Sequence, residues 1–240
     1  MRVKAVISYD GSQYQGFQKQ KSTKMTISTA IEEALASLQI SSPIVGSGRT
    51  DAGVHATGQV IHFDLPDFWN DLEKLKRNLN RKLTDISFKH ISVASNDFHA
   101  RFSAKKRVYR YVFKTQKPSV FEQKYISYYD AFDPAQLIQA LKIFEGKHDF
   151  TFFHKTGTIT HTTIREIYRT DYVERNGYHF IYFQANGFLR SQVRMMVDAA
   201  MLCARGELSL TQLQEQLKCR TKHTTKLAPP EGLYLAKIIY

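Results

Sequence analysis

The 240-residue sequence predicts an α+β fold, in which helices cover one face of a mainly antiparallel sheet. Segments with alternating apolar residues, typical of strands, are interspersed with segments whose apolar residues recur at helical spacing. An Asn176-Gly177 pair between two alternating runs predicts an antiparallel hairpin. The length suits two closely packed α+β halves, which we expect at residues 1–104 and 105–240.

The first half is expected to contain two strands and two helices. Residues 1–9 alternate like a strand that ends at a turn, and Thr26 is a plausible cap for a helix over 27–38. A second strand is expected near 58–65. A weaker helix follows, with a leucine stripe between residues 72 and 79.

The second half is expected to contain a strand, a helix, a hairpin, a helix and a closing strand. The aspartate-proline pair at 133–134 marks the start of its first helix. The expected elements are a strand at 105–113, a helix at 133–144, hairpin strands at 164–173 and 178–184, a helix at 189–204 and a strand at 232–240.

The composition favours a nucleic acid partner and argues against several other classes of protein. The formal net charge is +12, and thirteen tyrosines and sixteen phenylalanines accompany the cations, a mixture that suits RNA. Only Cys203 and Cys219 are present, which excludes a disulfide scaffold and favours the reducing cytoplasm. The nine histidines form no metal-binding motif, so no metal is expected. The sequence contains no run of about 18 apolar residues, so no membrane span is expected.

The segment 46–55 combines three glycines with a cation, Arg49, and a carboxylate, Asp51. A phosphate-binding loop would need a different glycine spacing and a helix after it, whereas an extended run follows here. A solvated turn explains many such segments. The remaining interpretation is a catalytic carboxylate on a loop that feeds a strand, with Arg49 beside it to contact a phosphate or displace a base.

Short motifs spread over nearly the whole chain are, in their order and spacing, highly specific. They are Tyr-Asp-Gly at 9–11, Gly-Phe-Gln at 16–18, Gly-Arg-Thr-Asp-Ala-Gly-Val-His at 48–55, Gly-Gln-Val at 58–60, Phe-His-Ala-Arg-Phe-Ser-Ala at 98–104, Tyr-Arg-Tyr at 109–111, His-Asp-Phe-Thr at 148–151, Asn-Gly-Phe-Leu at 186–189, Val-Arg at 193–194 and Glu-Gly-Leu-Tyr-Leu at 231–235. Through these motifs the chain resembles the tRNA pseudouridine synthase A (TruA) family.

The resemblance implies a pseudouridine synthase fold, with two related α+β halves that form a continuous sheet, helices on its outer face and a central basic cleft. It implies that Asp51 is the catalytic nucleophile and that Arg49 helps to flip or replace the target nucleotide. Tyr109 would stack on the uracil, and Arg194 would pair with the catalytic aspartate. Asp198 lies one turn beyond Arg194, where the family more often has glycine, and could share that arginine.

The implied activity is isomerisation of uridine to pseudouridine at positions 38–40 of the tRNA anticodon stem-loop, without a cofactor. The implied partners are tRNA, through its anticodon arm, and a second copy of the chain in a cytoplasmic homodimer. Two alternatives remain open: an RNA-binding or RNA-folding protein in which chemistry is secondary, and a nucleotide-dependent enzyme that uses the glycine loop.

Overall fold

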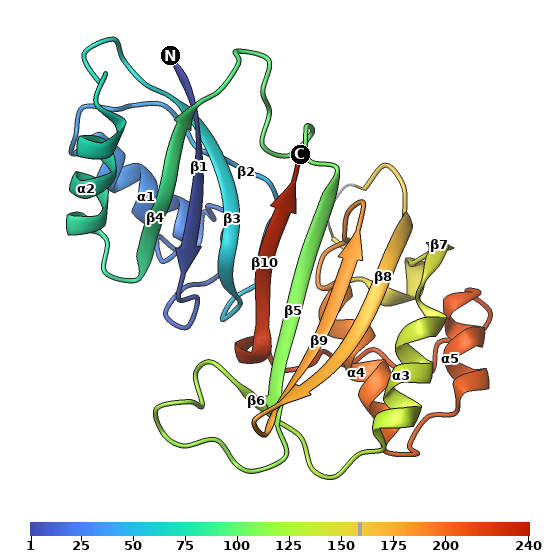
Figure 1. Ribbon diagram of the computed structural model, residues 1–240. Helices are drawn as coiled ribbons and strands as arrows, with labels where there is room; N and C mark the ends of the chain where they lie inside the picture. The colour runs from blue at the N-terminus through green and yellow to red at the C-terminus, as the bar shows by residue number, and fades with distance from the viewer. Residues whose placement is uncertain (158–159) are drawn as a thin grey trace. The chain divides into compact units, whose positions relative to one another are not determined.

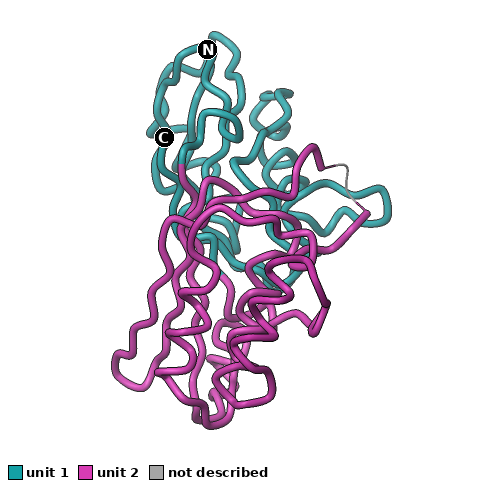
Figure 2. The backbone as a smooth tube through the Cα atoms, turned by 90° about the vertical axis from the view of Figure 1, so that its right-hand side faces the viewer, with its two compact units in different colours: residues 1–105, 234–240 teal, residues 106–233 magenta. Residues whose placement is uncertain are grey.

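The computed structural model describes residues 1–157 and 160–240, which form two compact units. Unit 1 comprises residues 1–105 and 234–240, and unit 2 comprises residues 106–233 (Figure 2). The α+β class and the mainly antiparallel strand pairing are confirmed. The division expected between residues 104 and 105 stays a prediction about domains. The compact units differ from it in one respect, because the closing strand groups with unit 1.

Unit 1 is a sheet of strand order β4-β1-β3-β10 with two helices (Figure 1). Its elements are β1 (Arg2–Tyr9), α1 (Ile27–Ala36), β2 (Val45–Gly46), β3 (His55–Asp64), α2 (Leu72–Lys82), β4 (Ile86–Val93) and β10 (Leu233–Ile239). β1 lies antiparallel to both β3 and β4, β2 pairs antiparallel with β3, and β10 pairs parallel with β3.

The core of unit 1 contains alternate residues of β1 and the apolar stripe of α1. Val3 and Ile7 are fully buried on the strand, and Ile31 is fully buried on the helix. The Thr26 hydroxyl caps α1 by accepting a hydrogen bond from the Thr29 amide at 3.2 Å, as its position in the sequence predicts. The helix and the cap are therefore confirmed.

Unit 2 is a sheet of strand order β5-β9-β8-β7 with three α-helices. Its elements are β5 (Lys106–Lys114), β6 (Ser127–Tyr128), α3 (Pro134–Ile143), β7 (Gly146–Asp149), β8 (Ile164–Arg175), β9 (Tyr178–Ala185), α4 (Gln192–Ala204) and α5 (Leu210–Leu217), with 3₁₀ turns at Thr151–Phe153 and Pro230–Gly232. Strands β5, β9, β8 and β7 pair antiparallel in that order, and the short β6 pairs parallel with β5.

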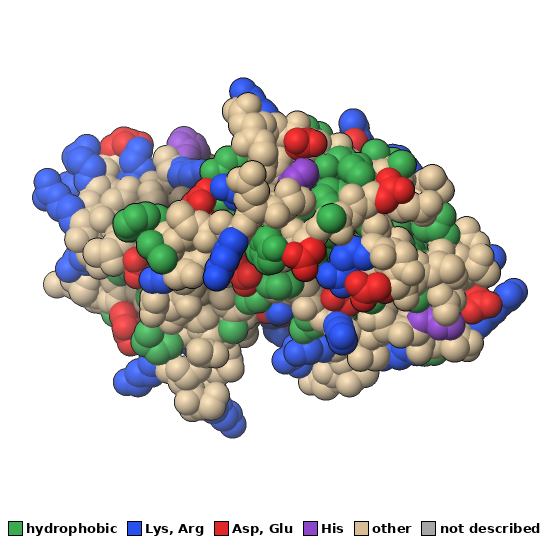
Figure 3. Space-filling view, turned by 90° about the horizontal axis from the view of Figure 1, so that it is seen from below, with side chains coloured by type: hydrophobic (Ala, Val, Ile, Leu, Met, Phe, Trp, Pro, Cys, Tyr) green, Lys and Arg blue, Asp and Glu red, His purple; other side chains and the backbone are tan. Residues whose placement is uncertain are grey.

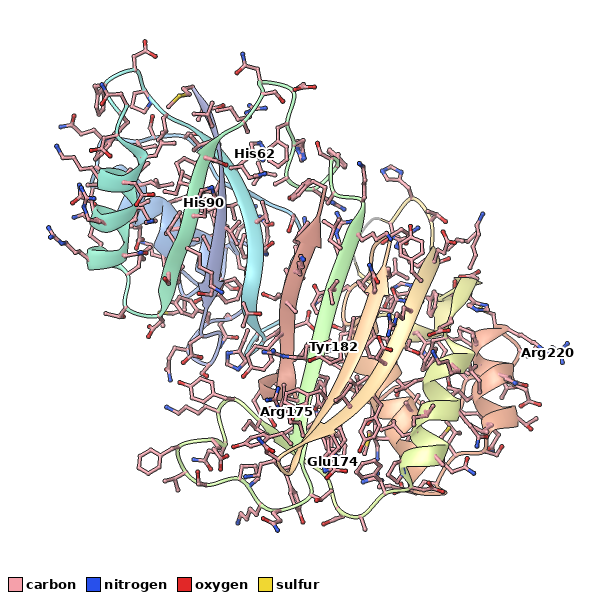
Figure 4. All side chains as sticks on the ribbon, in the orientation of Figure 1. His62, His90, Glu174, Arg175, Tyr182 and Arg220 are labelled. Atoms are coloured by element: carbon pink, nitrogen blue, oxygen red, sulfur yellow. The ribbon has the colours of Figure 1, made fainter. Side chains whose placement is uncertain are left out.

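The hairpin of unit 2 forms where the sequence predicts it. Asn176 and Gly177 have φ values of 54° and 75°, the left-handed conformations that a type I′ turn needs. Figure 4 shows Arg175 and Glu174 at this end of the hairpin and Tyr182 along β9. Phe183 and Ile181 point from β9 into the core, where both are fully buried.

The strand β4 and the helix α5 are not predicted by the sequence patterns described above, and neither are the short strands β2, β6 and β7. β4 lies at the edge of its sheet and alternates only imperfectly, because exposed polar residues interrupt its buried ones. α5 is short, but it begins with a capping box in which Ser209 and Gln212 satisfy each other's backbone amides. That box is a sequence signal by which α5 could have been found. Across residues 1–157 and 160–240, no helix is long and apolar enough to cross a membrane.

The segment 115–126, between β5 and β6, is anchored through the carboxylate of Glu122. This carboxylate accepts hydrogen bonds from the amide and hydroxyl of Ser119 at 3.0 and 2.9 Å. It also accepts from the Tyr178 hydroxyl at 2.8 Å and from Lys114 Nζ at 3.2 Å. These donors, led by the Ser119 amide, lower the pKa of Glu122 from 4.5 to about 2.

Acid is therefore expected to weaken the anchor of this segment. A carboxyl whose pKa is lower in the folded state stabilises the protein above its unfolded pKa, and this contribution is lost as the pH falls from about 4.5 through about 2. In Glu122→Gln this part of the acid sensitivity should be missing, whereas Glu73→Gln, at an exposed ion pair on α2, should keep it. Urea unfolding midpoints measured from about pH 6 to about pH 2.5 test this expectation. Equal acid sensitivity in wild type and Glu122→Gln would contradict it.

Candidate active site and its scaffold

Arg49 and Asp51 lie on the loop that joins β2 to β3 in unit 1. The Arg49 side chain is exposed and Asp51 is half-buried. The backbone turns tightly at this point, since the Val54 amide donates a hydrogen bond to the Asp51 carbonyl at 3.2 Å. A carboxylate on a loop whose backbone is held in this way can act as a nucleophile or stabilise a positive charge, and a cation on the same loop can contact a phosphate.

The end of β1 and the segment that leads from it to α1 hold this loop in place. The Tyr9 hydroxyl and the Thr50 hydroxyl form a buried hydrogen bond of 2.8 Å. The Phe17 amide donates to the Thr50 carbonyl at 3.1 Å, and the Gly53 amide donates to the Tyr14 carbonyl at 3.3 Å. The residues on both sides of Asp51 are thereby attached to the same neighbouring segment.

Two glycines allow the supporting segment to come this close. A Cβ atom on Gly11 would lie 2.1 Å from the Val54 carbonyl oxygen, far inside van der Waals contact. A Cβ atom on Gly16 would lie 2.8 Å from the Thr50 carbonyl oxygen, and the φ of Gly16 is +101°, which L side chains rarely adopt. The glycines at 11 and 16 are therefore required by contact with the Asp51 loop.

His55, where the loop enters β3, is almost fully buried. Its Nδ1 accepts a hydrogen bond from the Gly11 amide at 3.0 Å and lies 3.3 Å from an Asp10 carboxylate oxygen. Its ring stacks on Tyr234 of β10, with centroids 4.8 Å apart. His55 thus joins the end of the loop to the turn that follows β1 on one side and to β10 on the other.

Gln59 fixes the opposite end of the loop from a fully buried position on β3. Its side-chain oxygen accepts hydrogen bonds from the Ser47 hydroxyl at 2.6 Å and from the Val60 amide at 3.1 Å. Its side-chain nitrogen donates to the Gly48 carbonyl at 2.8 Å. Gln59 therefore holds the residues that lead into Arg49 and Asp51.

His62, labelled on β3 in Figure 4, has a packing role. Its Nδ1 accepts a hydrogen bond from the Ala100 amide at 3.1 Å, and both residues are buried. Burial, followed by the nearby positive charge of Arg2, lowers the pKa of His62 below its usual value. The neutral ring therefore ties the segment 98–104 to the sheet.

Tyr109 lies on β5 in unit 2 and is only 7% exposed. It stands opposite Phe183 in the β5–β9 register, so its side chain shares a face with the core residues of β9. Its ring meets Phe188 edge to face, with centroids 5.1 Å apart. Tyr109 therefore has two aromatic neighbours, Phe183 and Phe188.

Arg194 lies on α4, also in unit 2, and is joined to the chain before β10. Its Nε donates to the Ala228 carbonyl at 2.6 Å, and the Ala228 amide donates to the Arg194 carbonyl at 3.1 Å. Asp198, one turn further, accepts a hydrogen bond from the Thr224 hydroxyl at 3.2 Å. Burial raises the pKa of Asp198, and the charged groups that act on it are Lys226, Arg205 and Glu207.

The structure thus places Arg49 and Asp51 together on one loop of unit 1, and Tyr109 and Arg194 on β5 and α4 of unit 2. Sequence reasoning assigned no role to Tyr9 or Gln59, although both lie within the motifs quoted above. Among the described residues, no group of His, Cys, Asp or Glu side chains could hold a metal ion.

Comparison with known proteins covers almost the whole chain. A family model described as tRNA pseudouridine synthase matches residues 5–103 and 140–240. The tRNA pseudouridine synthase A of Helicobacter hepaticus is 42% identical over 99% of this chain and 98% of its own length. The enzymes of the same name from Campylobacter jejuni and a Geobacillus strain are each 37% identical, over 100% of this chain and 100% and 98% of their own lengths.

Similarity to solved structures is weaker. A structure of an H/ACA RNP bound to a substrate RNA containing 2'-deoxyuridine is 12% identical over 83% of this chain and 43% of that chain, with a TM-score of 0.39. This likeness is too low to inform the fold. The sequence relationships are strong and extend over both units, and the family expected from the motifs is confirmed. The chain belongs to the tRNA pseudouridine synthase family.

Proposed function

We propose that the chain isomerises uridine to pseudouridine at positions 38–40 of the tRNA anticodon stem-loop. The observation that carries the proposal is the 42% identity, over nearly both full lengths, to an enzyme named tRNA pseudouridine synthase A. The loop that bears Asp51 adds chemical support, since the backbone on both sides of its carboxylate is anchored. The choice of positions 38–40 rests on the sequence motifs.

The reaction is an isomerisation in which every atom is retained. The N1–C1′ bond of uridine breaks, the uracil turns, and C5 bonds to C1′. C5 then loses a proton and N1 gains one, so no oxidant, reductant or added group is needed. We assign the nucleophile to Asp51, because an ionised carboxylate can attack the sugar or base, or stabilise the positive charge that develops at C1′.

The other proposed site residues act on the target nucleotide or on Asp51. A base within a stem must leave its stack at a cost of a few kcal/mol. The exposed Arg49 is suited to take the place of that base, and Tyr109 is suited to stack on the uracil. Arg194 is proposed as the cation that pairs with the Asp51 carboxylate and fixes its orientation.

The proposed partner, oligomeric state and cellular compartment follow from the same motifs. The anticodon arm of tRNA is the partner, and the net charge of +12 favours contact with its phosphates. We also propose that the chain works as a homodimer in the cytoplasm. Sedimentation velocity of the purified chain tests the dimer directly.

The function is tested by treating an unmodified tRNA transcript that carries uridines at positions 38–40 with the wild-type chain. Carbodiimide mapping should then show pseudouridine at these positions. A matched transcript with cytidine at all three should stay unmodified. Pseudouridine elsewhere in the tRNA would contradict the proposed positions, and its absence from both transcripts would contradict the activity.

A further inference from the structure

Segment 115–126 presents two apolar side chains to solvent. Phe121 is 86% exposed, the highest value among the large hydrophobic side chains of the described residues, and the adjacent Val120 is 69% exposed. On the face drawn in Figure 3, hydrophobic side chains reach the surface among both basic and acidic side chains. An exposed phenyl ring beside a second apolar side chain is a candidate contact surface.

The exposure of Phe121 does not come from a loose segment. The residue next to it, Glu122, receives four hydrogen bonds through its carboxylate, as described above. Its amide and that of Gln123 both donate to the Ser119 carbonyl at 3.0 Å. The Tyr125 amide donates back to the Glu122 carbonyl at 2.8 Å. The backbone around Phe121 is therefore fixed by hydrogen bonds, although the ring itself is exposed.

The charges of the segment indicate which partner would use the ring. Lys117 precedes Phe121 in the sequence and Lys124 follows it, and both lysines are exposed. The single carboxylate between them, Glu122, is already engaged by Lys114 and by three neutral donors. An exposed aromatic ring in a segment that also exposes two lysines matches unpaired nucleic acid, whose bases stack on rings while its phosphates attract cations.

We propose that segment 115–126 is an RNA contact, in which Phe121 stacks on an unpaired base of tRNA and Lys117 and Lys124 contact neighbouring phosphates. The proposal rests on the proposed function, because tRNA is the RNA that the chain would meet there. It assigns to this segment a role in affinity and none in the chemical step.

The test compares the affinity of the full chain for an unmodified tRNA transcript across a salt series. Phe121→Ala should weaken binding about tenfold, since stacking on one ring typically contributes this much, and Phe121→Trp should retain it. Lys117→Gln combined with Lys124→Gln should lower the slope of log affinity against log salt by about two. Phe68→Ala, at a ring that is 61% exposed in unit 1, is the matched control and should bind like wild type.

Two further readouts distinguish the possible failures. Sedimentation velocity at the assay concentration shows whether Phe121→Ala changes the oligomeric state. A change that accounts for the lost affinity would overturn the RNA contact in favour of self-association. An unchanged affinity in Phe121→Ala, with pseudouridine formed normally, would overturn the contact alone. Weakened binding by Phe121→Ala, when even wild type forms no pseudouridine, would support the contact and contradict the proposed function.

Discussion

Asp51→Asn is expected to reduce pseudouridine formation by about 10³-fold or more, the scale on which loss of a catalytic nucleophile acts. The amide has nearly the shape of the carboxylate, but it carries no charge and is a poor nucleophile. Affinity for the tRNA transcript should change by less than about threefold, because a loss confined to the chemical step leaves substrate binding in place. Single-turnover rates at saturating enzyme, with affinity measured separately, give both quantities.

Asp67→Asn is a suitable control, since Asp67 is an exposed carboxylate in the same unit. It removes the same charge from the protein without touching the Asp51 loop, and its rate should match that of wild type. If Asp51→Asn kept more than about a tenth of the wild-type rate, the assignment of the nucleophile would be wrong.

Gly11→Ala is expected to have the second-largest effect, although Gly11 contacts no substrate in the proposed mechanism. Its new Cβ would lie 2.1 Å from the Val54 carbonyl oxygen, so the backbone beside Asp51 must shift. A displacement of about 1 Å at a reacting group can cost about 10²-fold in rate. The strain should also lower the free energy of unfolding by about 1–3 kcal/mol. Single-turnover kinetics and urea unfolding measure the two losses.

Gly206→Ala separates the loss of activity from the loss of stability. Gly206 has a φ of +73° and nothing within 4 Å of an added Cβ, so alanine there meets only backbone strain. That strain costs about 1–2 kcal/mol, which is close to the loss expected for Gly11→Ala. The control should therefore be destabilised similarly and remain active. Equal rates in the two variants would show that Gly11 does not position the Asp51 loop.

Local chemistry explains which parts of the fold could be predicted from the sequence. The turn at Asn176 and Gly177 and the cap at Thr26 depend on neighbouring residues, and both occur as predicted. The edge strand β4 lacks a clean alternation, because the register of its pairing with β1 shifts and two exposed residues, Lys89 and His90, follow one another. It was therefore missed.

The scaffold of the site could not be predicted in the same way, because its contacts join distant residues. Tyr9 and Thr50 are 41 positions apart, and His62 and Ala100 are 38 apart. The sequence predicts Gly11 as part of a turn after the first strand, whereas its contact with Val54 explains why no side chain fits there. Asp51 itself was identified from the local pattern of its loop and from its motif, and its role stays a prediction.

The place of β10 in unit 1 has a consequence for how the protein is made. The strand pairs with β3 at Tyr234 and His55, yet a ribosome adds it only after all of unit 2. At usual rates of translation, this delay is on the order of ten seconds. During that time β3 has an unpaired edge beside the Asp51 loop, and such edges promote association with other chains. Until β10 is made, the edge of β3 next to the candidate active site is therefore open to association with other chains.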